Sequence, residues 1–373
     1  MGRLTFVVLG YGVALGATSI AFPLLALEAG LSPIAVGLLA TVSAVLQMGG
    51  KITLPALLTR FSDRSIIALA ISVMLAAASV LLIATTAIWF VAAQVLQGTS
   101  RGLFWTASQT HGIRTKGVAT RQIAFIQGIG QVGTMVGPFL AGLLAARSLF
   151  TSLWAAVGIS AACLALSLTL HKLPTYQRAP RKSRVPIWRR KGVGPGNWGG
   201  AIAGAWRGVL ESFVPVILSA AGYGTAIVGA LMSMAELCGL IATGAVARWG
   251  GRNVGRFIPY TALALGAGLV MLALWSQIWV VVLALAIAGT GGGVGGVLGS
   301  ASINEAVEHS EQGAAIALVG LYRAAARSTA PSLVSGALAV ATLPAGLAVL
   351  AIGITFPILW IRPRRIGSVT AEP

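Results

Sequence analysis

The sequence of 373 residues is too apolar for an ordinary soluble protein, because 57% of its residues are hydrophobic, 9% are charged and its mean hydropathy is +0.89. A soluble domain carries about 25% charged residues, so much of the surface of this chain must face lipid. The formal net charge of +18 would point to nucleic acid in a soluble protein, but in a membrane chain the positions of the charges decide its meaning.

Long apolar segments recur along the whole chain, and a membrane-spanning helix needs about 20 mostly apolar residues. The first six such segments lie near 4–27, 33–58, 65–84, 87–108, 122–145 and 149–170. Six more lie near 198–220, 225–247, 256–276, 278–302, 313–336 and 339–361. The first segment is too long for a signal peptide and lacks an obvious cleavage site, so we interpret it as a retained span.

The spans form two groups of six. This grouping predicts six-helix bundles at 1–171 and 198–361, a basic cytoplasmic linker at 172–197 and a cytoplasmic tail at 362–373. Lys and Arg residues outside the spans lie at joins on one side of the membrane, with Arg147 as the exception. Cytoplasmic joins are rich in Lys and Arg, so both termini are expected in the cytoplasm and the chain in the plasma (inner) membrane. The net charge then reflects topology and anionic lipid, not nucleic-acid binding.

The two halves share weak sequence matches that occur in the same order at nearly constant separation. They pair LQGTSRG (96–102) with IAGTGGG (287–293), VGPFLAG (136–142) with TAPSLVSG (329–336), and RFSDR (60–64) with WGGRN (249–253). Such internal repeats are typical of membrane transporters. The sequence therefore predicts an all-α integral membrane protein with twelve transmembrane helices in two pseudo-symmetric six-helix bundles.

The repeat also gives a meaning to the glycine run at 286–300. Gly291, Gly293 and Gly296 form a G-x-G-x-x-G pattern, which in a βαβ unit binds a dinucleotide. Here the neighbouring segments are membrane spans. The glycines are therefore expected to allow close helix packing or helix bending, and no nucleotide is expected.

Two stretches resemble the major facilitator superfamily, in particular its drug:proton antiporter branch. The segment FPLLALEAGLSPIAVGLLATVSAVLQ is similar to the opening of that branch, and the fifth span carries its antiporter motif at Gly133, Gly137, Pro138 and Gly142. A proline kink with small-residue packing is the alternative interpretation of the same residues. The resemblance implies a monomeric transporter that exports a small molecule in exchange for protons, with no cofactor and no enzymatic activity.

The gating turn of that family is altered in this sequence. Between the second and third spans, Arg60 and Arg64 match the family pattern, but Thr59 stands where the family has an aspartate. The second copy of the turn keeps Gly251 and Arg252. The resemblance therefore implies an inner gate at these positions that lacks its usual acidic lock.

A charged residue inside a span costs about 2.5–3.5 kcal/mol on insertion scales, so such residues should face protein or water. The sequence places seven of them there: Lys51, Arg101, Arg207, Glu211, Glu236, Arg323 and Arg327. The third, sixth, ninth and twelfth spans carry none, and the resemblance makes those four the lipid-facing helices. The charges are thus expected to line a central cavity.

The composition of this set favours an anionic or amphipathic substrate, because cations outnumber carboxylates. Arg323 and Arg327 share one helix face and repel each other unless an anion lies between them. Arg101 is expected in the cavity or at a gate, and Glu211 and Glu236 are the candidates for proton coupling. Ion pairs that only position helices are the alternative. His111 is expected to be a plain interfacial histidine, and neither a metal site nor an ATP-binding loop is indicated.

The sequence thus predicts a secondary-active transporter that works by alternating access, most simply a proton-coupled exporter of a small molecule. An importer of an anionic metabolite on the same scaffold is the first alternative. A non-transporting receptor or scaffold is the second, although a scaffold has no need of buried charges.

Overall fold

The computed structural model describes residues 2–116, 119–175, 192–249, 254–307 and 312–359, and these form twelve α-helices. The first six are α1 (Gly2–Glu28), α2 (Pro33–Arg60), α3 (Asp63–Leu82), α4 (Ala87–Lys116), α5 (Ala119–Ala145) and α6 (Leu149–Ser167). The second six are α7 (Val193–Ala220), α8 (Thr225–Trp249), α9 (Ile258–Leu274), α10 (Ile278–Glu305), α11 (Gln312–Val340) and α12 (Leu343–Thr355). Short 3-10 segments, η2 (Val254–Phe257) and η4 (Phe356–Leu359), precede α9 and follow α12. Each predicted span contains one helix, so the predicted fold class is confirmed.

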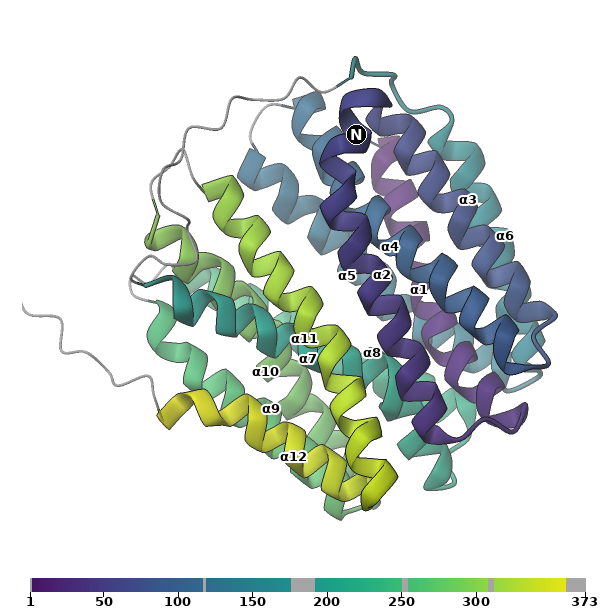
Figure 1. The fold of residues 1–373 in the computed structure, drawn as a ribbon, viewed down its shortest axis with the longest axis vertical. Helices are drawn as coiled ribbons and strands as arrows, with labels where there is room; N and C mark the ends of the chain where they lie inside the picture. Colours follow the sequence, from purple (N-terminus) through teal and green to yellow (C-terminus); the bar gives the residue numbers. More distant parts are fainter. Residues whose placement is uncertain (1, 117–118, 176–191, 250–253, 308–311, 360–373) are drawn as a thin grey trace, which may run out of the picture.

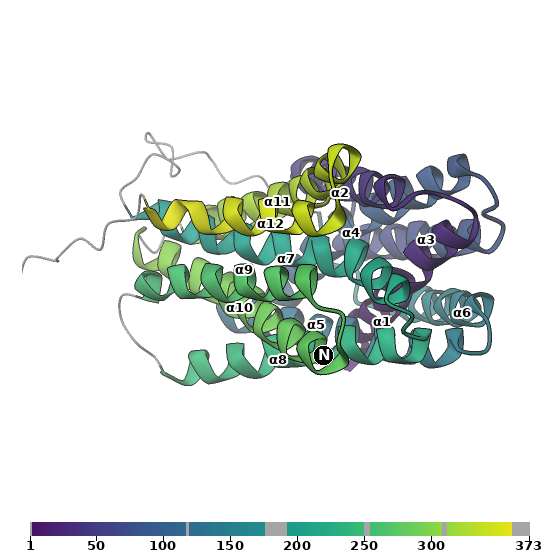
Figure 2. The same ribbon diagram turned by 90° about the horizontal axis from the view of Figure 1, so that it is seen from below.

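The helices divide into two bundles that lie side by side, α1 to α6 coloured purple through blue, and α7 to α12 coloured teal through green to yellow in Figure 1. In the first bundle α1 packs on α5 and α6, while α4 packs on α2 and α3. In the second bundle α7 packs on α11, and α10 packs on α8 and α9. The bundles meet mainly through α5 against α8 and α2 against α11, and Figure 2 shows the same division from another side.

Close helix contacts repeat between the bundles, which supports their pseudo-symmetry. A Cβ atom on Gly16 of α1 would lie 2.6 Å from Cδ of Pro138 on α5. A Cβ atom on Gly208 of α7 would lie 3.0 Å from Cδ of Pro331 on α11. Both prolines lie inside their helices. The weak proline match between the halves therefore corresponds to one packing arrangement used twice.

The glycine run lies within the single helix α10, which packs against three neighbours. A Cβ atom on Gly291 would lie 2.7 Å from the Thr261 carbonyl oxygen of α9, and one on Gly293 would lie 2.8 Å from the Cα of Gly239 on α8. One on Gly296 would meet the Ala203 side chain of α7 at 3.0 Å. Small residues allow such close approach between membrane helices. The run is therefore a packing surface, and no loop is present there to hold a phosphate.

By length and composition, nine helices of the described part of the chain could each cross a membrane. The exceptions are α4, α11 and α12. Helices α4 and α11 carry the arginines Arg101, Arg323 and Arg327, and α12 has 13 residues before it continues as η4. The arginines of the central charge cluster thus contribute to the low hydropathy of α4 and α11.

The outer helices carry large exposed apolar side chains. Leu69 of α3, Trp154 of α6, Leu263 of α9 and Ile352 of α12 are 52%, 63%, 49% and 64% exposed. In Figure 1, α3 and α6 lie at one edge of the molecule and α9 and α12 at the opposite edge. Apolar side chains in these positions face lipid, which leaves the charged helices for the interior.

Candidate functional site

Three arginines from three helices meet the carboxylate of Glu211 on α7. Nη1 of Arg101 on α4 lies 2.7 Å from Oε2 of Glu211, and Nη2 of Arg327 on α11 contacts the same oxygen. Nη1 of Arg207, one helical turn before Glu211, lies 3.8 Å from Oε1. Arg101 belongs to the first bundle and the others to the second. The Arg101–Glu211 ion pair therefore joins the two bundles near the middle of their helices.

A second carboxylate, Glu236 of α8, extends this cluster. Nη2 of Arg207 lies 2.9 Å from Oε2 of Glu236 and 3.4 Å from the Thr134 hydroxyl oxygen on α5. The other oxygen of Glu236, Oε1, is buried and has no hydrogen-bond partner among the described residues. Arg207 thus links the two carboxylates, and Glu236 has one oxygen that is ready to accept a proton.

Two further cations lie next to the cluster without a carboxylate of their own in the described part of the chain. Arg323 donates from Nη2 to the Gly296 carbonyl oxygen at 3.2 Å, and its Nε has no partner there. Lys51 of α2 lies close enough to Arg323 and Arg327 to interact with their charges. Positive charge therefore exceeds negative charge at the centre, and the excess lies on α2 and α11.

The cluster leaves little empty space around it in this conformation. The cavity beside Arg101, Glu211 and Arg327 has a volume of about 20 Å³, and the one beside Arg207 and Glu236 has about 10 Å³. A single water molecule needs a cavity of roughly 10–15 Å³ on this measure. The Glu211 carboxylate itself therefore fills the position that faces the arginines.

The two bundles touch on the side of the cluster away from the N-terminus. The Thr41 hydroxyl of α2 lies 2.8 Å from that of Ser332 on α11, and Ser233 of α8 donates to the Met135 carbonyl oxygen of α5 at 2.6 Å. Toward the end where the N-terminus lies, the ribbons of the two bundles diverge (Figure 1). The contacts among the described residues thus close one end of the interface between the bundles.

The antiporter-motif glycines form a close contact between α5 and α1. A Cβ atom on Gly133 would lie 2.9 Å from the Cα of Gly12, and one on Gly137 would lie 2.8 Å from the Cα of Gly16. Any larger residue would push the two helices apart. The small residues predicted in α5 thus hold it against α1, within the first bundle.

The last residues of the motif face the other bundle. A Cβ atom on Gly142 would lie 2.9 Å from the Cα of Gly229 on α8. The carbonyl oxygen of Pro138 also faces Gly229. The motif therefore forms a close-packed seam that joins α1, α5 and α8, and its part in proton exchange stays a prediction.

The predicted gate residues lie apart from the central cluster. Arg60 is exposed in the last turn of α2, and Arg64 donates from Nη1 to the Leu170 carbonyl oxygen at 3.2 Å. Gly251 and Arg252 lie outside the described residues, as do most of the linker 172–197 and the whole tail 362–373. Helix α7 begins at Val193, ahead of the predicted span at 198–220.

Sequence reasoning missed the partners of His111. This side chain is only 3% exposed, and its Nδ1 lies 3.3 Å from Oδ2 of Asp63, which is fully buried at the start of α3. Nη1 of Arg114 lies 3.5 Å from the same oxygen. The expectation of a plain interfacial histidine is therefore wrong. A signal was present, because Asp63 is the single aspartate of the chain.

Two related six-helix bundles that enclose a buried ionic centre define a membrane transporter. The chain belongs to the Major Facilitator Superfamily, whose family model matches residues 4–331. It is accordingly a multi-pass secondary transporter of a small-molecule substrate, not an enzyme. No curated protein matches the sequence.

Solved structures of other transporters share the fold. A mutant of the nucleoside transporter NupG superposes with a TM-score of 0.77 at 12% identity, over 96% of this chain and 98% of that one. The unmutated NupG gives a TM-score of 0.73 at 12% identity with the same coverage. The human organic anion transporter MFSD10 (TETRAN) gives 0.67 at 15% identity, again over 96% and 98%. These likenesses show the fold alone, so the drug:proton antiporter branch stays a prediction.

Proposed function

We propose that this chain exports a small organic anion in exchange for protons, and that the anion binds at the cluster around Glu211. The observation that carries the proposal is the meeting of Arg101 and Arg327, from different bundles, on one carboxylate oxygen. Guanidinium groups arranged around a carboxylate also fit the carboxylate or phosphate of a ligand. A monomer in the plasma (inner) membrane, with both termini in the cytoplasm, completes the proposal.

In this account Glu211 holds the place of the substrate. In this conformation its carboxylate is paired with the arginines, and the central cavities are too small for a ligand. An incoming anion displaces Glu211 from Arg101 and Arg327 and exchanges one anionic partner for another. The arginines keep a counterion throughout the exchange, and Arg207, which lies 3.8 Å from Oε1 of Glu211, remains as the partner of the displaced carboxylate.

The same exchange links binding to the movement of the bundles. The Arg101–Glu211 pair joins the bundles at 2.7 Å, so this contact must break before they rock apart at the closed end. A substrate anion that takes Arg101 from Glu211 supplies the energy for that break. Differential binding of this kind is what a ligand needs in order to shift a conformational equilibrium.

Proton coupling is assigned to Glu236. Its Oε1 is buried and has no hydrogen-bond partner, while its Oε2 contacts Arg207. A proton on Glu236 removes the charge that holds Arg207, which frees this arginine to hold Glu211 in the cluster, so protonation favours Glu211 over the substrate. The loss of a proton from Glu236 returns Arg207 to it. The protonation of Glu236 and the occupancy of the anion site would in this way depend on each other.

The name of the MFSD10 neighbour, an organic anion transporter, agrees with an anionic substrate, although the resemblance is one of fold. The excess of cations over carboxylates at the centre carries more weight. A cation within a membrane-spanning helix is costly when it has no counterion, and Lys51 and Arg323, which are partly buried, have none among the described side chains. A bound anion would lower that cost.

Transport into everted membrane vesicles tests the proposal. A panel of labelled monocarboxylates, dicarboxylates and organic phosphates, together with cationic drugs, is offered with and without a proton gradient. We expect gradient-driven uptake of an anion, lost in Arg101→Gln and kept in Arg147→Gln, which removes an exposed arginine near the end of α5.

Three outcomes would contradict the proposal. Transport of cationic drugs but no anion would remove the substrate class. Accumulation in intact cells instead of everted vesicles would favour the importer. Proton-driven transport that is unchanged in Glu236→Gln would remove Glu236 from coupling while leaving the anion site in place.

A further inference from the structure

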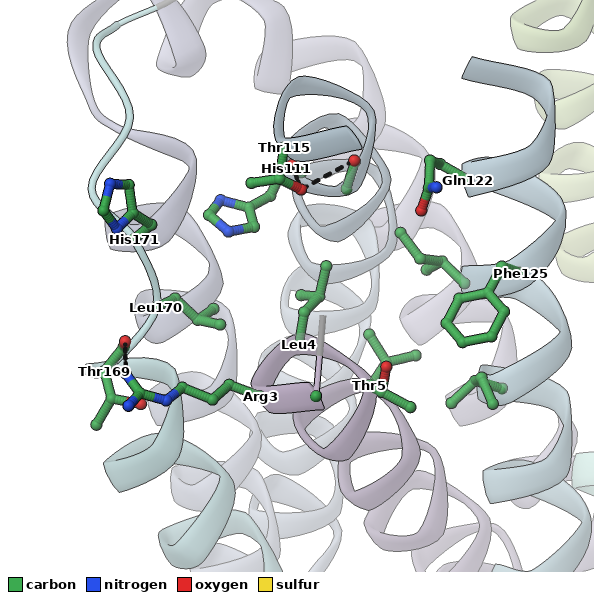
Figure 3. A pocket seen from close by; sticks show the side chains of 15 residues that line it. Arg3, Leu4, Thr5, His111, Thr115, Gln122, Phe125, Thr169, Leu170 and His171 are labelled. Atoms are coloured by element: carbon green, nitrogen blue, oxygen red, sulfur yellow. Dashed lines mark hydrogen bonds between the residues drawn. The ribbon is translucent and has the colours of Figure 1, made fainter. Parts of the chain in front are cut away.

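A cavity of about 400 Å³ lies within the first bundle, near the end that carries the N-terminus. The start of α1, the end of α4, the start of α5 and the segment that follows α6 line it (Figure 3). It shares no lining residue with the two small cavities beside Glu211. Its volume is in the range of about 300–1,000 Å³ that is usual for small-molecule sites. This cavity is therefore large enough for a ligand and separate from the central cluster.

The walls of the cavity are mainly apolar. Leu4 and Val8 of α1 contribute to them, as do Phe125, Ile126 and Ile129 of α5. Leu4, Val8 and Ile126 are buried, whereas Phe125 is 42% exposed. Apolar walls of this kind favour the hydrocarbon part of a ligand, because its burial removes apolar surface from water.

The ionisable side chains of the lining are the basic residues Arg3, His111 and His171, and no carboxylate lines the cavity. Arg3 donates from Nη1 to the Thr169 carbonyl oxygen at 2.9 Å, which holds its guanidinium at the rim. Figure 3 shows His171 on the same side as Arg3, and His111 between that side and α5. The charge of this lining fits an anionic group.

Gln122 supplies an independent sign of a ligand. It is only 6% exposed, it lines the cavity on the side opposite Arg3, and its Oε1 has no hydrogen-bond partner among the described residues (Figure 3). Buried polar groups in native proteins are almost always hydrogen-bonded, so such an atom requires an explanation. An amide oxygen only accepts hydrogen bonds, so a donor held in the cavity, such as a water molecule that also donates to the anionic group of a ligand, would satisfy it.

We propose that this cavity is a second binding site, which takes a single-chain amphipathic anion such as a medium-chain fatty acid. The carboxylate lies toward Arg3 and His171, and the hydrocarbon chain lies along Val8, Phe125 and Ile129. A cavity of this volume, enclosed by segments of one bundle, holds a single chain better than a two-chain phospholipid. Because the site lies between α1, α4 and α5, its occupant would bind within one bundle and not between the two.

Photolabelling tests this site directly. The full-length protein in nanodiscs of zwitterionic phospholipid is irradiated with decanoate that carries a diazirine, and the labelled peptides are mapped by mass spectrometry. We expect labels on the start of α1 and the start of α5, with competition by unlabelled decanoate. Decanol has no charge and acetate has no chain, so we expect both to compete at least about tenfold more weakly.

Variants separate this site from the central one. We expect Arg3→Gln to weaken labelling about tenfold, since it removes a charged partner of the carboxylate. Thr115→Trp, at an exposed position of the rim, should block labelling by filling the entrance. Arg147→Gln and Arg101→Gln should label like the unmodified chain, the first as a charge control and the second as a control for the central site.

Several results would overturn the proposal. Labels confined to the lipid-facing helices α3 and α6 would show probe in the bilayer only. Equal competition by decanol or by acetate would remove the amphipathic anion as the ligand class, and competition by anionic phospholipid but not by decanoate would remove the single chain. Labelling that survives both Arg3→Gln and Thr115→Trp in folded protein would place the probe elsewhere.

Discussion

The replacement Glu211→Gln should destabilise the protein strongly when no anion is bound. The carboxylate is 14% exposed and is contacted by Arg101 at 2.7 Å, by Arg327, and by Arg207 at 3.8 Å. A glutamine amide keeps the shape but removes the charge, so the buried Arg101 and the partly buried Arg207 and Arg327 lose their shared counterion. Removing one partner from a buried ion pair typically costs about 3–5 kcal/mol, and we expect a loss of this size.

The assay is unfolding of the purified protein in detergent, followed by intrinsic tryptophan fluorescence in an anion-poor buffer. Glu28→Gln is the matched control, because Glu28 is exposed at the end of α1 and its replacement should change stability by less than about 0.5 kcal/mol. A transported anion should restore stability to Glu211→Gln, by about 2.7 kcal/mol at a concentration one hundred times its Kd.

Two results would refute this reasoning. If Glu211→Gln unfolds at the same denaturant concentration as the unmodified chain, the arginines do not depend on Glu211 as a counterion. If it is destabilised but no transported anion restores it, Glu211 holds the bundles together without standing in the place of the substrate. The first result removes the electrostatic account, and the second removes the substrate site from this cluster.

Three further predictions follow from the same contacts. Arg101→Lys keeps the charge but loses the planar guanidinium, so its initial rate of anion transport in everted vesicles should fall about tenfold, and a full rate would contradict the assigned role. Gly137→Ala should lower the free energy of unfolding by about 1–3 kcal/mol because its Cβ would lie 2.8 Å from the α1 backbone. Gly128→Ala on the same helix should cost nothing, since no atom lies within 4 Å of its Cβ position, and equal effects of the two would disprove the packing argument. In the double variant Thr41→Cys/Ser332→Cys, whose hydroxyl oxygens lie 2.8 Å apart in the unmodified chain, oxidation should stop transport and reduction should restore it. Either single variant is the control, and full transport after verified cross-linking would show that this end need not open.

The twelve helices could be predicted because each span is a long apolar run that ends at charged or glycine-rich joins. The residues at which the helices begin and end were less predictable. Helix α4 continues to Lys116, beyond the predicted span at 87–108, because His111 and Arg114 turn inward to Asp63. From the sequence these polar residues resemble a solvated join. Their burial depends on α3 packing against α4, which no local pattern reveals.

The charged residues of the site could also be predicted, because each is expensive inside a membrane and therefore conspicuous. Their pairing could not. The spacing of Arg207 and Glu211 indicates one helix face, and the structure does bring them together, at 3.8 Å. The shorter contact, at 2.7 Å, comes from Arg101 in the other bundle, and Arg207 contacts Glu236 more closely, at 2.9 Å. Such pairs depend on how helices far apart in the sequence pack, which sequence spacing does not encode.

The two bundles repeat their backbone contacts but not their charges, and this difference bears on the mechanism. Four residues before the paired prolines, the first bundle has Thr134 where the second has Arg327. Three residues after the paired glycines Gly16 and Gly208, the first has Ser19 where the second has Glu211.

Matched backbones allow the bundles to rock as similar rigid bodies about the interface. The unmatched charges place Glu211, Glu236 and most of the arginines on one of these bodies. Their mutual distances therefore stay nearly constant while the bundles move. Arg101, which the first bundle contributes, is the arginine whose distance to Glu211 must change. The ion pair that reports the conformational state of this transporter is thus Arg101–Glu211, and an anion that competes for Arg101 acts directly on that state.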